Sequence, residues 1–357
     1  MPIAINGSGT LTGLSVGGLE DGIITPAELS TGGPGWDAQS NLTNVASINA
    51  GPLAGMRNAI INGNFDIWQR GTSFTGSEYG ADRWVSARAF TTHTATRQAF
   101  TLGQTDVTGE PAYYHQTVVS SVAGAGSLSI LAQPIEDVRT FAGQQVTISF
   151  WATADATKNI AVELAQIFGS GGSPSATVDA IGVTKVSIGT SWQKIIITAN
   201  VPSIGGKTLG TDNNNSVNLN IWFDAGSDFN SRTDTLGQQS GTFDIARVQM
   251  EPGPVDTLFE RRPIGTELSL CQRYFCMTVA TTRGYNAGSG FVDTAVRWPV
   301  TMRATPTVLN ITNTGAGYQT QQLVDPSIYG CRHTLFGTAA ASDMYAVNQH
   351  ITASAEL

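Results

Sequence analysis

Charged side chains are scarce in this sequence, since Asp, Glu, Lys and Arg together make up 13% of its 357 residues. The usual share in soluble proteins is about 25%. Hydrophobic residues nevertheless make up 41% of the chain, which is enough to offset the chain entropy lost on folding. The sequence therefore excludes a disordered protein. Its length predicts two or three folded domains with neutral, polar surfaces.

Clusters of basic residues are also missing. The 19 Lys and Arg residues are outnumbered by 27 Asp and Glu residues, which gives a net charge of −8. Proteins that bind the backbone of nucleic acids need Lys and Arg gathered into patches. We therefore expect no nucleic-acid partner.

Long apolar runs and paired cysteines are absent as well. No window approaches the roughly 18 apolar residues of a membrane helix, and the first residues lack the basic and apolar regions of a signal peptide. Cys271, Cys276 and Cys331 form an odd, sparse set without a Cys-x-x-Cys pair, which favours synthesis in a reducing cytoplasm. We expect neither membrane insertion nor secretion.

Catalytic motifs are the last absence. Glu136 and Asp137 are sequence neighbours, so on a strand their side chains would point to opposite faces. The four histidines show no metal-ligand spacing. The sequence predicts a protein that is not an enzyme, although carboxylates from distant strands could still meet in a glycosidase site.

Hydrophobic and polar residues alternate in the region from 56 to 260, as they do in β-strands. The pattern is clear in residues 145–152 and 217–224, and residues 192–200 and 242–250 predict two further strands. Turns rich in Gly, Asn and Ser separate these segments. Several short strands without a helical period predict a β-sandwich.

Three separated segments point to a family: Arg57–Gly71, Thr242–Gly253 and Arg261–Phe275. All three resemble tail-fibre proteins of tailed bacteriophages. The first contains Asn-Gly-Asn-Phe-Asp ending at Asp66, and the second contains Asp-Ile-Ala-Arg-Val-Gln-Met starting at Asp244. These stretches resemble the opening and closing elements of jelly-roll carbohydrate-binding modules. The resemblance implies a mainly β chain with a jelly-roll β-sandwich in the middle.

The three segments also suggest where the chain divides. Residues 1–55 would be an extended N-terminal segment for virion attachment and trimerisation, with a short helical turn started by the capping box Thr25-Pro-Ala-Glu28. A disordered tail is the alternative for this part. Residues 56–260 would form the jelly roll. Residues 261–357 would form a short helix and a small, β-rich distal domain.

The resemblance implies a structural calcium ion at two acidic residues. In the jelly-roll modules the acidic residue of the opening element and the Asp of the closing strand often bind calcium, and Asp66 and Asp244 occupy those positions. Both are hard oxygen donors suited to this ion. In the alternative interpretation each carboxylate bonds only to backbone amides, or Arg70 replaces the ion as a counter-charge.

Two tryptophans are candidates for sugar binding. Trp151 and Trp222 fall on the polar faces of their strands, where an exposed ring could stack on a sugar while Asn220 and Asp224 bind its hydroxyl groups. In the alternative interpretation a loop or a neighbouring subunit covers both rings.

The resemblance implies a phage tail-fibre protein that is made in the host cytoplasm and assembled into the virion tail. It would form a homotrimer, attach through its N-terminus to another tail or baseplate protein, and bind a host-surface glycan with its sandwich and distal domains. The alternatives are a structural virion protein without a receptor role, and a polysaccharide-degrading tailspike or carbohydrate-active module.

Overall fold

The computed structural model describes residues 55–357, apart from positions 289, 313, 339 and 341, and the backbone of four short strands before them. The chain divides into two compact units, 1–55 and 56–357. The helical turn expected at Thr25–Glu28 lies outside the described residues, as does most of the expected attachment segment. That role stays a prediction.

Two antiparallel pairs of short strands are described in the first unit. They are β1 (Ala4–Ile5) with β2 (Leu11–Thr12), and β3 (Gly35–Trp36) with β4 (Leu42–Thr43).

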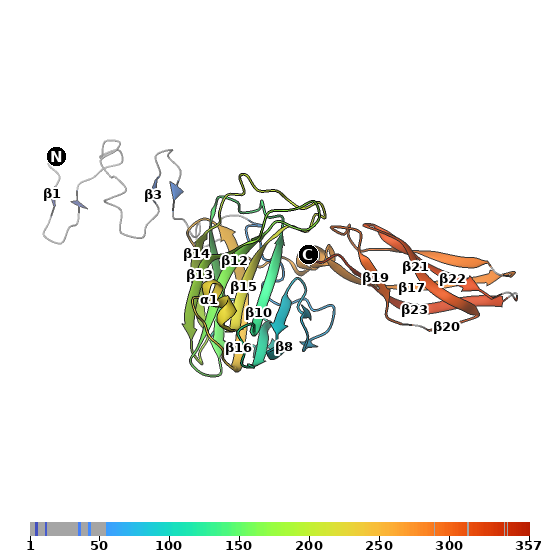
Figure 1. Ribbon diagram of the computed structural model, residues 1–357, viewed down its shortest axis with the longest axis horizontal. Helices are drawn as coiled ribbons and strands as arrows, with labels where there is room; N and C mark the ends of the chain where they lie inside the picture. The colour runs from blue at the N-terminus through green and yellow to red at the C-terminus, as the bar shows by residue number, and fades with distance from the viewer. Residues whose placement is uncertain are drawn as a thin grey trace. The chain divides into compact units, whose positions relative to one another are not determined.

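The second unit contains a jelly-roll β-sandwich of two six-stranded antiparallel sheets (Figure 1). The first sheet has the order β13-β12-β15-β10-β7-β6. Its strands are β6 (Glu78–Tyr79), β7 (Val85–Ala89), β10 (Leu128–Glu136), β12 (Lys158–Ile167), β13 (Val178–Ile188) and β15 (Ser216–Ala225). The second sheet has the order β14-β11-β16-β9-β8-β5. Its strands are β5 (Ser73–Phe74), β8 (Thr92–Ala99), β9 (Tyr113–Ser120), β11 (Gln145–Ala154), β14 (Gln193–Asn200) and β16 (Gly241–Pro252).

The main core lies between these two sheets. Phe150 of β11 and Ile221 and Phe223 of β15 are buried in it, at the hydrophobic positions of the alternating pattern. Phe223 stacks on Phe243 of β16, with ring centroids 5.0 Å apart. The predicted sandwich is confirmed, because the hydrophobic faces of the predicted strands meet in one core.

A second hydrophobic cluster covers the outer face of the first sheet. Ala161 and Trp222 are buried there against Phe229 and Leu236. These two come from the segment around the 3-10 helix η1 (Ser227–Phe229) and the short helix α1 (Asn230–Thr233). Strands β10, β12 and β15 are thus buried on both faces. Strands β10 and β12 therefore show no clear alternation in the sequence, and neither was predicted.

The distal part begins with α2 (Ile264–Gln272), as predicted, and continues as two small antiparallel sheets. Trp298, Met302 and Ile351 belong to a core of its own. One sheet contains β17 (Phe275–Asn286), β19 (Thr307–Asn310), β20 (Gly315–Ala316) and β23 (Ser342–Ser354). The other contains β18 (Phe291–Arg297), β21 (Tyr318–Ser327) and β22 (Gly330–Gly337). Strands β21 and β22 were not predicted, because their many polar residues leave no clear alternation of hydrophobic and polar positions.

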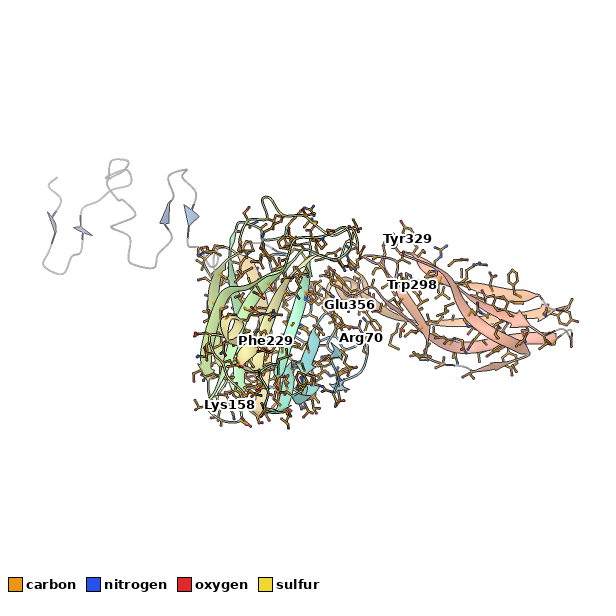
Figure 2. The ribbon with its side chains drawn as sticks, in the orientation of Figure 1. Arg70, Lys158, Phe229, Trp298, Tyr329 and Glu356 are labelled. Carbon is orange, nitrogen blue, oxygen red and sulfur yellow. The ribbon has the colours of Figure 1, made fainter. Side chains whose placement is uncertain are left out.

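An ion cluster connects the C-terminal residues to the sandwich. The carboxylate of Glu356 accepts hydrogen bonds from Arg83 and, at 2.8 Å, from Nη2 of Arg70; Figure 2 labels Arg70 and Glu356. The Tyr79 hydroxyl donates to the backbone oxygen of Leu357 at 2.9 Å. Arg83 is buried, with its guanidinium 3.5 Å from the ring centroid of Tyr274. In the part of the chain that the structure describes, no helix is long and apolar enough to span a bilayer.

Candidate functional site

The candidate site is a pocket on the outer face of the second sheet. Strand β16 supplies Asp244 to this face, because its neighbours Phe243 and Ile245 point into the core. Thr153 of β11 pairs with Asp244 in the register. The pocket has a volume of about 490 Å³. It is lined by Asp106, Thr153, Ala154, Asp155, Thr190, Ser191, Trp192, Thr242 and Asp244.

Three aromatic rings form one wall beside this pocket. The ring centroid of Trp192 lies 5.2 Å from that of Phe100 and 5.3 Å from that of Tyr114, and the rings of Phe100 and Tyr114 are 4.8 Å apart. The Tyr114 and Trp192 rings meet edge to face at 81°, an arrangement that the ring quadrupoles favour. Mutual packing holds the half-buried Trp192 in place.

Asp244 is electrostatically unusual within the pocket. Its pKa is raised to about 6, mainly by burial; a hydrogen bond of 3.0 Å from the Gln116 side-chain amide lowers the pKa, and the charge of Asp155 raises it. Burial, with the charge of Asp244, also raises the pKa of Tyr114. Near neutral pH Asp244 is therefore a hydrogen-bond acceptor, and below about pH 6 it becomes a donor as well.

The chemistry of this pocket suits a polyhydroxylated ligand. Carboxylates and the Thr and Ser hydroxyls of the lining can bind hydroxyl groups, while the ring of Trp192 offers an apolar surface. The pocket was not predicted from the sequence, because the alternating pattern placed Trp192 as the first residue of a strand. The only usable signal was an aromatic residue at a strand end, directly after the polar turn Gly189–Ser191.

The expectation that Trp222 is an exposed sugar platform is wrong. The ring is completely buried, 5.2 Å from the ring centroid of Phe229, and the guanidinium of Arg232 lies 4.9 Å from it. Its Nε1 donates to the Glu163 carboxylate at 3.2 Å. The segment around η1 and α1 covers the ring, so the alternative interpretation of a loop over Trp222 is correct.

The two polar partners proposed for Trp222 are also buried and already bonded. The Asn220 amide donates to Glu163 at 3.1 Å. The Asp224 carboxylate accepts bonds from the hydroxyls of Thr91, at 2.6 Å, and Ser121, at 2.9 Å. Neither side chain is free to bind a sugar, so both assignments are wrong.

Trp151 lies elsewhere. It is half-buried on β11, between the core residues Phe150 and Ala152, and so points to the outer face of the second sheet. Trp222 belongs to the outer face of the other sheet, and the two tryptophans therefore cannot form one site. Thr153, two residues beyond Trp151, lines the pocket beside Trp192. A role of Trp151 in sugar binding stays a prediction.

The two residues proposed for calcium line different pockets. Asp244 belongs to the pocket beside Trp192, whereas Asp66 lines a second one and accepts a bond of 2.9 Å from the Asn64 amide. Across the described residues no group of three or more His, Cys, Asp and Glu side chains is placed to hold a metal. Calcium stays a prediction for each residue separately.

Arg70 does not serve as the counter-charge of Asp66. Its guanidinium instead donates to Asp82 at 3.1 Å and to Glu356 at 2.8 Å, in the cluster at the C-terminal residues. Arg70 therefore belongs to the connection between the sandwich and the distal part.

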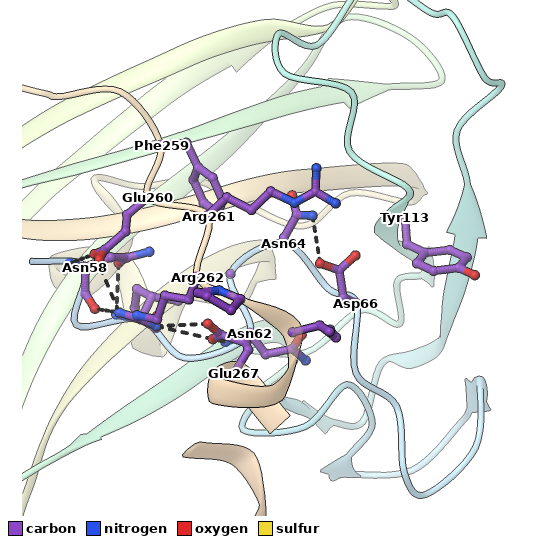
Figure 3. A pocket seen from close by; sticks show the side chains of 14 residues that line it. Asn58, Asn62, Asn64, Asp66, Tyr113, Phe259, Glu260, Arg261, Arg262 and Glu267 are labelled. Carbon is purple, nitrogen blue, oxygen red and sulfur yellow. Dashed lines mark hydrogen bonds and ion pairs between the residues drawn. The ribbon is translucent and has the colours of Figure 1, made fainter. Parts of the chain in front are cut away.

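The second pocket has a volume of about 550 Å³ and lies between the opening segment of the sandwich and residues 259–267, which lead into and begin α2 (Figure 3). Arg262 holds this region together by donating to the Ile60 backbone oxygen at 3.1 Å and to the Glu267 carboxylate at 3.2 Å. The backbone N–H of Asn58 donates to Glu260 at 2.8 Å. Most polar groups of this pocket are thus engaged with one another.

No protein-family model and no curated protein matches the chain. Several solved structures are similar to it at low identity. The enzymatically active domain of tailspike protein 4 of bacteriophage CBA120 is 14% identical, with a TM-score of 0.34 over 57% of this chain, and the match spans 22% of the tailspike chain. A family 11 carbohydrate-binding module from Clostridium thermocellum, in complex with a mixed-linked tetrasaccharide, is 12% identical, with a TM-score of 0.32 over 52% of this chain and 98% of that chain. The xylan-binding domain CBM22-1 of Paenibacillus barcinonensis Xyn10C is 10% identical, with a TM-score of 0.29 over 51% of this chain and 94% of that chain.

Proposed function

We propose that this chain is a tail-fibre protein whose sandwich binds a host-surface glycan in the pocket beside Trp192. The observation that carries the binding proposal is the meeting of an aromatic wall with a polar lining. Trp192 packs on Phe100 and Tyr114, and Asp155 and Asp244 line the adjoining pocket. Shallow polar sites with a few aromatic anchors are suited to sugars.

The tail-fibre part of the proposal is supported by the three segments that resemble phage fibres. In this proposal residues 1–55 attach the protein to another virion protein, and three copies assemble into one fibre. Three linked weak sites on one fibre would then exceed the affinity of a single site by about 10² to 10⁴. Sedimentation of the purified protein tests the assembly, and a monomer at micromolar concentration would contradict it.

The binding proposal is tested with a Trp192→Ala variant on a glycan array and on candidate host cells. We expect the variant to lose binding while its melting temperature stays near that of the wild type, since Trp192 lies at the surface side of the sheet. Phe90→Ala is the matched control, because Phe90 is an aromatic residue that is 74% exposed and does not line the pocket. Full binding by Trp192→Ala would overturn the assignment of the pocket.

One observation favours a hydrolytic alternative. Asp155 and Asp244 line one pocket, and burial is the main cause that raises the pKa of Asp244 to about 6. Glycosidases use two carboxylates that differ in protonation. Release of reducing ends from a bound polysaccharide, abolished by Asp244→Asn, would favour this alternative. Binding of the polysaccharide without release of reducing ends supports the non-enzymatic proposal.

A further inference from the structure

Arg247 has an unusual backbone conformation in the closing strand of the sandwich. Its φ is +52°, in the left-handed region that residues other than glycine rarely adopt. The register between β11 and β16 shifts at this point, between Ser149 and Trp151, so Arg247 is the extra residue of a β-bulge. Bulges re-aim side chains, and strained backbone gathers at functional sites.

The guanidinium of Arg247 is half-buried without a partner. It lies 4.6 Å from the ring centroid of Phe259, and its buried Nε has no hydrogen-bond acceptor. The loop between β8 and β9 leaves room for it, since a Cβ on Gly109 would lie 2.2 Å from Nη1. An unpaired, partly buried guanidinium is costly, because its lost hydration is not replaced.

A second arginine lies close to the first. Arg261 is exposed and lines the 550 Å³ pocket, where its side chain extends toward Asn64 and Asp66 (Figure 3). Among residues 56–357 as described, neither Arg261 nor Arg247 forms a hydrogen bond or an ion pair. Burial, and then the charge of Arg261, lower the pKa of Arg247 to about 10. Two like charges thus repel each other without a neutralising partner.

The nearby carboxylates do not fill this role. Glu260 accepts the backbone N–H of Asn58, and Glu267 accepts the guanidinium of Arg262. Asp66 accepts the amide of Asn64 and forms no ion pair with Arg261 within 4.0 Å in the structure. The Nη atoms of Arg262 donate to Ile60 and Glu267, although its Nε has no partner. The side chains of Arg247 and Arg261 differ from it, because neither forms a hydrogen bond or an ion pair in the described part of the chain.

We propose that Arg247 and Arg261 form a subsite for an anionic group of the bound glycan, a sugar carboxylate or a phosphate ester. Such a group accepts two or more charge-assisted hydrogen bonds from guanidinium groups. It would remove the repulsion between the arginines and satisfy the unpaired Nε of Arg247.

Two elements of the sandwich contribute residues both to the subsite and to the pocket beside Trp192. Asp244 and Arg247 are three residues apart on β16, a span of about 10 Å. The loop between β8 and β9 gives Asp106 to the pocket and Gly109 to the contact with Arg247. One short oligosaccharide can therefore contact both places. This inference rests on the proposed glycan binding, and it adds that the preferred glycan is acidic.

The test compares matched neutral and anionic sugars by titration calorimetry. The pairs are galactotriose with galacturonic acid trimer, and mannose with mannose 6-phosphate, so that carboxylate and phosphate are separated. We expect the wild type to bind at least one anionic sugar about tenfold or more tightly than its neutral partner, the effect of a hydrogen bond to a charged group. In Arg247→Gln/Arg261→Gln this preference should fall to less than about twofold.

Arg139→Gln is the matched control, since Arg139 is an exposed arginine that pairs with Asp137 and lines neither pocket. It should keep the preference. If the double variant loses stability, Arg261→Gln alone, at an exposed position, replaces it. The inference is overturned if the wild type binds neither anionic sugar more tightly than its neutral partner, or if Arg261→Gln and the double variant keep the full preference.

The same titrations separate this inference from the proposed function. Trp192→Ala should weaken neutral and anionic sugars together. If Trp192→Ala changes neither while the arginine variants weaken the anionic sugar, the pocket beside Trp192 is not the glycan site but the anionic subsite stands. If Trp192→Ala weakens both sugars of a pair and the arginine variants weaken neither, the glycan pocket stands and the subsite fails.

Discussion

Glu356 bonds to Arg70 across 286 positions of the chain, with Oε1 accepting from Nη2 at 2.8 Å. The other carboxylate oxygen accepts from the buried guanidinium of Arg83. One side chain near the end of the distal part thus neutralises two arginines of the sandwich.

Removing this carboxylate should destabilise the protein strongly. Glu356→Ala leaves Arg83, which is 1% exposed, without its ion-pair partner, and breaking one side of a buried pair costs about 3–5 kcal/mol. Urea unfolding measures the change. Glu110→Ala is the control, because Glu110 is an exposed glutamate with one local hydrogen bond, and its effect should stay within about 0.5 kcal/mol. Equal effects of the two substitutions would contradict the role of the cluster.

The buried tryptophan and the half-buried one should respond differently to truncation. Trp222→Ala opens a cavity under Phe229 and leaves Glu163 with one donor fewer, so we expect a loss of about 3–5 kcal/mol. Trp151→Ala removes a ring from the outer face of the second sheet and should cost clearly less. Thermal unfolding of both variants compares them. A larger loss for Trp151→Ala would mean that Trp222 is not the covered residue.

Asp244 should make stability depend on pH. Its folded pKa of about 6 lies above the ordinary value of 3.8. A raised carboxyl pKa means that the folded state holds the proton more tightly, so this contribution is full below about pH 4 and is lost as the pH rises through about 6. Asp244→Asn removes the charge. The free energy of unfolding of this variant, relative to that of the wild type, should therefore rise by up to about 2 kcal/mol between pH 4 and pH 7. Urea midpoints of both proteins at the two pH values measure this. If the urea midpoints of both proteins change equally between the two pH values, the raised pKa does not belong to Asp244.

The calcium prediction separates into two independent tests. Because Asp66 and Asp244 line different pockets, we expect the stability effects of Asp66→Asn and Asp244→Asn to add within about 0.5 kcal/mol. A shared ion would make the double variant no less stable than the more damaging single variant. A bound calcium also requires a chelator to lower the melting temperature of the wild type. An unchanged melting temperature would remove calcium from both positions.

The sequence predicted the sandwich from strands that have one polar face, such as β11 and β14. Alternation also placed Trp151 and Trp222 on outer faces correctly. It could not say which outer face is covered, because the cover over Trp222 comes from Phe229 and Leu236, which follow β15 in a separate segment. Alternation predicts on which face of the sheet a side chain lies. Whether that side chain is exposed depends on whether a segment distant in the sequence packs on that face.

The candidate site was not predictable for a related reason. Asp106 comes from a loop, Trp192 from the residue just before β14 and Asp244 from the closing strand. Only sheet pairing brings them together, and no spacing in the sequence reports it. Arg247 was equally hidden, because a bulge shifts its side chain out of the alternation that the rest of β16 follows.

The cluster around Glu356 also sets an order of events during synthesis. Arg83 is translated 273 positions before its partner carboxylate, so a nascent sandwich emerges with the Arg83 guanidinium not yet paired, whereas Arg70 already has Asp82 as a partner. The junction closes only when the strands of the distal part have followed. In a chain interrupted before that point, the guanidinium of Arg83 lacks the carboxylate of Glu356.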